Sequence, residues 1–162
     1  QKWTLFPYTT LFRSFIASGV WDEEPLEAAL LAEADRQVGS DGAWLIIDDT
    51  ALPKKGRHSV CVAPQYASAL GKNANCQTLV STTLASGEVP VMIGLRLFLP
   101  ESWTSNERRL ERAGVPADCR SYMTKPEIAL AEIDRVLAAG VRFGCVLGVT
   151  SRFVRQTTIW RT

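Results

Sequence analysis

The apolar pattern near the start of the chain predicts a helix that leads into a buried strand. The helix has apolar residues at close to helical spacing, namely Leu26, Leu30, Ala34 and Val38. Asp22 suits its first end as a cap, and Gly39 suits its last. Residues 44–47 then form a short apolar run without interruption, which is typical of a strand buried on both faces.

The middle of the chain predicts a loop region followed by a β-hairpin. Residues 59–63 favour a short strand, and residues 64–75, rich in Gly, Asn, Ser and Ala, are expected to form a long loop. Residues 77–85 and 89–99 are β-prone and flank a tight turn at 86–88, so we expect them to pair with each other.

The last third predicts a short charged helix, a longer helix and another strand. Residues 107–112 form the charged helical turn. Thr124 with Glu127 three positions later is a capping box, and Gly140 suits the end of the helix that it starts. The expected buried stripe of this helix is Ile128, Ala131, Ile133, Val136 and Leu137. Residues 143–148 then predict a buried strand, so the chain is expected to be an α/β domain with a mixed sheet and flanking helices.

Composition fits a single globular domain. The 162 residues are 46% hydrophobic and 22% charged, and the formal net charge is +1. Any attraction for nucleic acid must therefore come from local clusters of basic residues. No apolar run approaches the about 20 residues that a membrane-spanning helix needs, and we expect a soluble, cytoplasmic protein.

The cysteines predict reduced thiols. None of the four cysteines belongs to a Cys-x-x-Cys pair, and no signal peptide is evident. His58, Cys61 and Cys76 suggest a zinc site as an alternative, but a fourth ligand is missing, so the structural interpretation is favoured.

The first residues have a different origin from the rest. Residues 4–14 resemble, at every position, the translation of a synthetic adapter used to prepare DNA libraries for sequencing. We therefore treat residues 1–14 as an artefactual segment and leave them out of the fold prediction, as for any fusion scar. The alternative is a natural aromatic strand.

Candidate chemistry begins with the adjacent acids Asp48 and Asp49, which follow the predicted strand 44–47. Ligands collect at the carboxyl ends of strands in open α/β sheets. Because neighbouring residues of a strand point to opposite faces, at most one of the two is expected to be the primary ligand. Such a carboxylate can hold Mg²⁺ or Mn²⁺, and two ions about 4 Å apart promote phosphodiester cleavage. The alternative is a capped turn.

Two basic clusters invite two interpretations each. Lys54, Lys55, Arg57 and His58 are candidates for contacts with DNA phosphates, which would make binding dependent on salt, or they form a solvated turn. Three arginines raise the same choice, and the glutamates between them favour a solvated or ion-paired face; they are Arg108, Arg109 and Arg112. Trp103 either stacks on a base or packs.

Several short motifs in a fixed order resemble bacterial insertion-sequence transposases of the DDE superfamily. They are residues 47–60 (IDDTALPKKGRHSV), 65–66 (QY), 71–72 (GK), 75–77 (NCQ), 99–103 (LPESW), 108–109 (RR) and 124–127 (TKPE). The resemblance runs over residues 15–148. It implies a ribonuclease-H-like catalytic domain that uses Mg²⁺ or Mn²⁺ to nick transposon ends and join them to target DNA. The predicted order of three strands, a helix and a strand beside the first agrees with such a domain.

The resemblance also assigns site residues. Asp49 takes the place of the first catalytic aspartate and metal ligand, with Asp48 as its neighbour or substitute. The chain has Cys61 where the family has a glycine, and Val149 where the family has its second aspartate. Residues 149–162 are unlike the family, and the third acid would lie beyond Thr162.

These departures predict a partial domain, truncated after its fourth main strand. We expect an inactive fragment of a transposase. The alternative is a non-catalytic product that binds DNA or forms homodimers and regulates the full-length enzyme.

Overall fold

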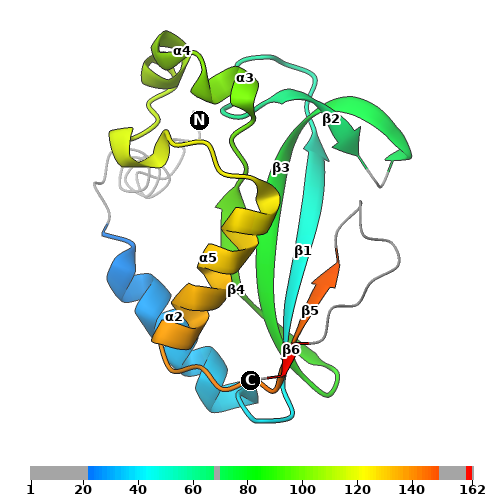
Figure 1. Ribbon diagram of the computed structural model, residues 1–162, viewed down its shortest axis with the longest axis vertical. Coiled ribbons are helices and arrows are strands. Elements are labelled where there is room, and N and C mark those ends of the chain that lie inside the picture. The colour runs from blue at the N-terminus through cyan, green and yellow to red at the C-terminus, as the bar shows by residue number, and fades with distance from the viewer. Residues whose placement is uncertain (1–21, 68–69, 150–159, 162) are drawn as a thin grey trace, which may run out of the picture.

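One mixed β-sheet organises the part of the chain that the structure describes, residues 22–67, 70–149 and 160–161 of a computed structural model (Figure 1). Its strands are β1 (Trp44–Pro53), β2 (Ala63–Ala67), β3 (Lys72–Ser86), β4 (Val89–Leu97), β5 (Cys145–Val149) and β6 (Trp160–Arg161). The helices are α2 (Glu24–Val38), α3 (Glu101–Thr104), α4 (Glu107–Arg112), the 3₁₀ turn η2 (Ala117–Cys119) and α5 (Lys125–Ala138). The segment assigned to an adapter, residues 1–14, lies outside the described residues.

The pairing of the strands confirms the predicted α/β fold with a mixed sheet. The strand order is β2-β3-β1-β5-β6, and β4 also pairs with β3. β1 is antiparallel to β3 and parallel to β5. The predicted hairpin is present as β3 and β4, with Ser86 opposite Val89 across its turn.

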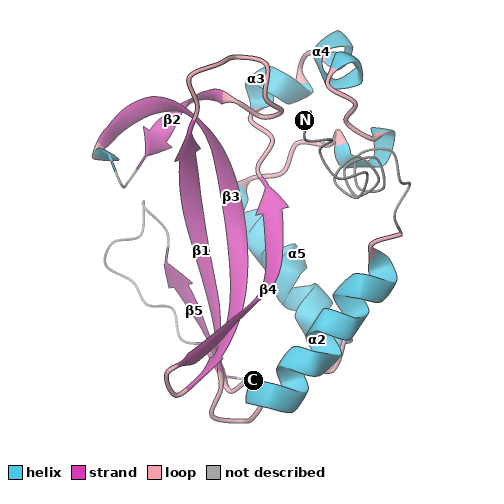
Figure 2. Ribbon diagram, turned by 180° about the vertical axis from the view of Figure 1, so that it is seen from behind, coloured by secondary structure: helices cyan, strands magenta, loops and turns pink. Residues whose placement is uncertain are grey.

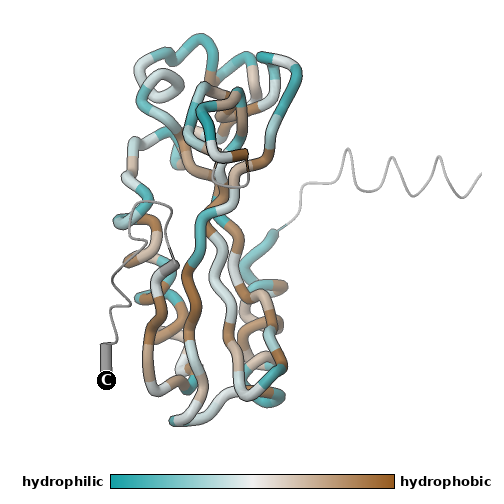
Figure 3. The backbone as a smooth tube through the Cα atoms, turned by 90° about the vertical axis from the view of Figure 1, so that its right-hand side faces the viewer, coloured by the Kyte–Doolittle hydropathy of each residue, from teal (hydrophilic) through white to brown (hydrophobic). Residues whose placement is uncertain are grey.

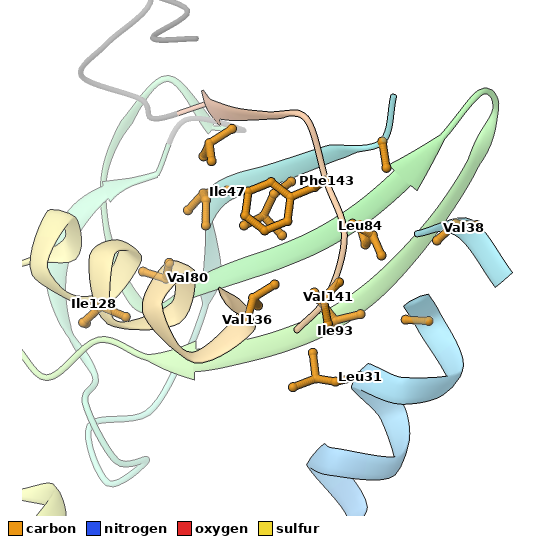
Figure 4. Packing of buried hydrophobic residues seen from close by; sticks show 14 residues of the cluster. Leu31, Val38, Ile47, Val80, Leu84, Ile93, Ile128, Val136, Val141 and Phe143 are labelled. Atoms are coloured by element: carbon orange, nitrogen blue, oxygen red, sulfur yellow. The ribbon is translucent and has the colours of Figure 1, made fainter. Parts of the chain in front are cut away.

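The two long helices cover one face of the sheet, and no described helix covers the other (Figures 1 and 2). α5 begins with the predicted capping box, in which the Thr124 N–H donates to Glu127 Oε2 at 2.7 Å. The core lies between these helices and the sheet (Figure 4). Its members include Leu31 and Val38 of α2, Val136 of α5, and Ile47, Val80, Leu84 and Ile93 of the sheet. No helix among the described residues is both long and apolar enough to cross a bilayer.

The predicted strand at 59–63 and loop at 64–75 are wrong. Residues 63–67 form β2, and β3 already begins at Lys72, so these two strands pair as a second hairpin. Polar residues such as Asn73 and Asn75 suggest a loop. In the structure, the backbone N–H and C=O groups of this segment instead pair with β2. Turn composition alone cannot distinguish such a hairpin from a loop.

Burial differs from the predicted pattern because the helices lie on one face of the sheet only. Trp44 of β1 is 44% exposed, so this strand is buried on one face and not on both. In α2, Leu26 is 73% exposed and Leu30 is also exposed, whereas Leu31, Ala34 and Val38 are buried. In α5, Ala131 and Leu137 are exposed. The cap of α2 is also shifted by one residue: Glu23 is the N-cap, although Asp22 Oδ1 accepts the Glu24 N–H at 3.2 Å.

A charged cluster of Glu27, Arg96, Glu132 and Arg135 joins both long helices to the sheet. Arg96 of β4 donates to Glu132 Oε1 at 2.7 Å and to both carboxylate oxygens of Glu27, at 2.6 and 2.8 Å. Arg135 Nη2 donates to Glu132 Oε2 at 2.8 Å. The hydrogen bonds from Arg96 hold the pKa of Glu27 below its usual range. Gly94 makes room for the cluster, because a Cβ atom there would lie 2.2 Å from Glu132 Oε2.

Candidate functional site

Asp48 and Asp49 lie inside β1 and not at its end, which corrects the prediction. β1 continues to Pro53 by pairing with β3 alone. Its parallel pairing with β5 stops at the acids, because Asp48 is opposite Val149, the last residue of β5. The acids therefore still mark the carboxyl end of the parallel pair, where ligands collect in α/β sheets.

The two acids point to opposite faces of the sheet, as strand alternation predicts. Asp49 is on the same face as the buried Leu45 and Ile47, under the helices. Its side chain is 8% exposed, and Asp49 Oδ2 accepts a hydrogen bond from the ammonium of Lys125. Lys125 is the first residue of α5, so the capping box that starts this helix also places the ammonium on the acid.

Asp48 is in a different environment from Asp49. Asp48 Oδ1 accepts the backbone N–H of Asp49 at 2.8 Å, and because both residues lie inside β1, the capped turn considered as the alternative does not form here. Burial raises the pKa of Asp48 above its usual range; the hydrogen bond from the Asp49 N–H opposes this rise, and the charge of Asp49 adds to it. Asp48 is therefore easier to protonate than an ordinary aspartate.

Replacing Lys125 with methionine should destabilise the fold by about 1–3 kcal/mol, because it removes a charged hydrogen-bond donor from a carboxylate that is 8% exposed. Urea unfolding measures the effect. In a double-mutant cycle, Lys125→Met with Asp49→Asn should cost clearly less than the sum of the single changes. Strictly additive losses would show that the pair contributes nothing to stability.

The described residues do not by themselves complete a two-metal centre. Within the described ranges no three His, Cys, Asp or Glu side chains are grouped closely enough to hold a metal ion. The carboxylate of Asp49 has the Lys125 ammonium as its cation. The zinc alternative also lacks a ligand group, because no such cluster of three side chains forms around His58, Cys61 and Cys76 in the described ranges. All four cysteines are free, as predicted.

Backbone conformation explains why a glycine suits position 61. Cys61 has a φ angle of 64°, in the left-handed region that glycine adopts without strain. The residue is fully buried in the turn between β1 and β2. Cys61, where the resemblance led us to expect a glycine, keeps this backbone conformation at some cost in strain.

The basic turn formed by Lys54, Lys55, Arg57 and His58 follows β1 directly, and all four residues are exposed. Asn75 of β3 holds the turn in place: its side-chain amide donates to the carbonyl oxygens of Lys54 and Gly56, at 2.9 and 2.8 Å. The basic side chains of this turn are therefore exposed to solvent, while hydrogen bonds hold its backbone in place.

A pocket of about 570 Å³ lies between this turn and α4. We call it the arginine pocket; its lining includes Arg57, His58, Trp103, Arg108, Arg109 and Arg112. Trp103 packs and does not present its ring for base stacking, since it is 1% exposed and its indole N–H donates to the Val62 carbonyl at 2.8 Å. Of the two faces expected for α4, solvated or ion-paired, the described residues agree with the solvated one: Arg108 and Arg112 are exposed, and the described ion pair from this helix joins Glu111 to Arg120 at 3.8 Å. The pocket was not predicted as a unit, and the basic residues at 57–58 and 108–112 are the signal that pointed to it.

Comparison with known proteins gives one consistent result. Residues 6–148 match the family described as DDE superfamily endonuclease. A probable transposase for insertion sequence element IS701 from Microchaete diplosiphon is 30% identical over 133 residues, which cover 82% of this chain and 32% of that protein. The chain thus spans about a third of the length of this relative. No solved structure matches significantly.

Proposed function

The chain belongs to the DDE superfamily of endonucleases found in insertion-sequence transposases, and on this premise we propose that it is part of a DNA transposase. The superfamily implies a divalent metal, Mg²⁺ or Mn²⁺, and DNA as the substrate. The reaction would be the nicking of transposon ends and their transfer to target DNA, in the cytoplasm.

The observation that carries this proposal is the placement of Asp49. Asp49, which we assign as the first family aspartate, lies on a central strand beside the parallel strand β5, and its side chain is 8% exposed. A carboxylate this well enclosed keeps a fixed orientation, which a metal ligand requires. Asp48, on the opposite face, would serve as neighbour or substitute.

We further propose that this chain is catalytically incompetent. Position 149, where the family has its second aspartate, is a valine, and its backbone pairs with Asp48. A two-metal centre depends on every one of its carboxylates, so an apolar residue at this position should prevent metal-dependent cleavage. The chain's own residues would then bind DNA and hold the Asp49 carboxylate without reaching the chemical step.

The exposed basic turn favours a second candidate function. A product that binds DNA without cutting it, alone or as a homodimer, would compete with the full-length enzyme for transposon ends. The exposed basic turn favours this role, because its cations are free to contact phosphates and its backbone is already ordered.

The test measures DNA binding by the 162-residue chain. Fluorescence anisotropy of a labelled duplex reports the affinity. Lys54→Ala with Lys55→Ala should weaken binding roughly tenfold and lower the salt slope by about 0.9 for each phosphate that the variant no longer neutralises. Arg36→Ala is the matched control, since it removes one exposed cation from α2 and should leave affinity unchanged. Affinity that is the same in all variants would exclude the basic turn as a region that touches DNA.

A further inference from the structure

The arginine pocket gathers cations from two segments that are far apart in the sequence. Arg57 and His58 come from the turn after β1, and Arg108, Arg109 and Arg112 come from α4. No carboxylate is among the residues that line it, and no described carboxylate forms an ion pair with these arginines. Four guanidinium groups without an internal counterion repel one another, so the pocket is suited to an anion.

One of these arginines is fixed in position before any ligand arrives. The guanidinium carbon of Arg109 lies 3.6 Å from the centre of the Trp103 ring, which is a cation–π contact. Arg109 Nη2 donates to the carbonyl oxygens of Arg57 and Val62, at 3.4 and 3.5 Å. Trp103 is itself buried and hydrogen-bonded, so its contact holds Arg109 in place between the turn after β1 and α4.

Two further arginines of α4, Arg108 and Arg112, line the pocket with exposed side chains. Arg108 and Arg112 are exposed and four positions apart on α4, so they lie on the same side of the helix and repel each other when nothing lies between them. Guanidinium groups bind phosphate oxygens through two parallel hydrogen bonds, which suits this arrangement.

The pocket also continues the basic turn. The segments that line the pocket, the turn after β1 and helix α4, lie at the end of the molecule toward which β1 and β5 point (Figure 1). The chain at this end is largely hydrophilic (Figure 3). Arg57 and His58 belong to both features, so a strand of phosphates that contacts Lys54 and Lys55 can extend into the pocket.

We propose that the arginine pocket binds backbone phosphates of duplex DNA and that Arg108 and Arg112 supply the contacts. This inference rests on the proposed function and adds a second contact region to it. Contacts with phosphates fix the position of a protein on the duplex without reading its sequence, so the pocket is expected to raise affinity equally for all sequences.

The experiment measures affinity of the full chain for a labelled duplex across a salt series. Arg108→Ala with Arg112→Ala should weaken binding about tenfold and lower the salt slope by up to about 2. Arg108→Lys with Arg112→Lys should keep most of the salt slope, because charge is preserved, while losing part of the affinity. Arg36→Ala is again the control, and far-ultraviolet circular dichroism confirms that each variant is folded.

The outcomes separate the pocket from the basic turn. If the change at Lys54 and Lys55 weakens binding but the change at Arg108 and Arg112 does not, the pocket proposal is overturned and the proposed function stands. If the unmodified chain binds no duplex, both fail. If the arginine variant loses only the thermal stabilisation given by inorganic phosphate and keeps its DNA affinity, the pocket takes a free anion and the DNA proposal is overturned.

Discussion

Replacing Glu132 with alanine should lower the free energy of unfolding by about 3 kcal/mol, as expected when one partner of a buried ion pair is removed. The Glu132 side chain is 5% exposed and accepts hydrogen bonds from both Arg96 and Arg135. Without it, two guanidinium groups between α5 and β4 lose their shared carboxylate. Arg96 keeps Glu27, which limits the loss.

Urea unfolding followed by circular dichroism measures this effect. Glu132→Gln keeps the size of the side chain and an acceptor oxygen, so it should lose clearly less than Glu132→Ala. Glu33→Ala is the matched control: Glu33 also pairs with an arginine, Arg36, but on the exposed side of α2, and its loss should leave the urea midpoint almost unchanged. If Glu132→Ala and Glu33→Ala behave alike, the charged cluster does not stabilise the fold.

Nicking of supercoiled DNA by this chain should stay at background in Mg²⁺ or Mn²⁺. We expect a complete loss of nicking activity, because metal-dependent phosphodiester cleavage needs several carboxylates in one site. Asp49 supplies one. Asp48 lies on the opposite face of the strand, and the residue that pairs with Asp48 across the parallel strands is Val149.

The ion pair between Asp49 and Lys125 strengthens this expectation. The Lys125 ammonium also lies 5.7 Å from the centre of the Phe98 ring. A divalent ion could bind at Asp49 only if the Lys125 ammonium were displaced, or if further acids were added to balance the charge of both cations. Conversion of supercoiled plasmid to the nicked form, followed on agarose gels, measures the rate.

Local signals predicted the elements that depend on local contacts. The capping box of Thr124 and Glu127 placed the start of α5, and the Ser86–Glu88 turn placed the β3–β4 hairpin. Strand alternation placed Asp48 and Asp49 on opposite faces. Each of these features is decided by residues within a few positions of one another, so a single sequence contains enough information for them.

Features that depend on distant contacts were missed. The ion pair of Lys125 with Asp49 spans 76 positions, and the bond from Arg96 to Glu27 spans 69. Glu132 lies four residues from both Ile128 and Val136 in the buried stripe of α5, and this spacing is the one local hint of its burial. Hydrophobic patterns assign a charged residue to the surface unless a partner on another element is known.

The composition of β2 and of the start of β3 also misled the prediction. Polar residues at an edge of the sheet resemble a loop, because one side of such a strand meets solvent. The arginine pocket was missed for a different reason. The basic residues at 57–58 and 108–112 are visible in the sequence, but it is the contacts of Arg109 with Trp103 and with the Arg57 carbonyl that bring the two segments together.

The most direct test of catalytic incompetence is plasmid nicking by the unmodified chain and by Asp49→Ala, in Mn²⁺, at protein concentrations where anisotropy shows the DNA to be bound. We expect the bound plasmid to stay supercoiled with both proteins. Nicked product that appears with the unmodified chain and disappears with Asp49→Ala would contradict this expectation, because Asp49 would then be working in a complete active site despite Val149.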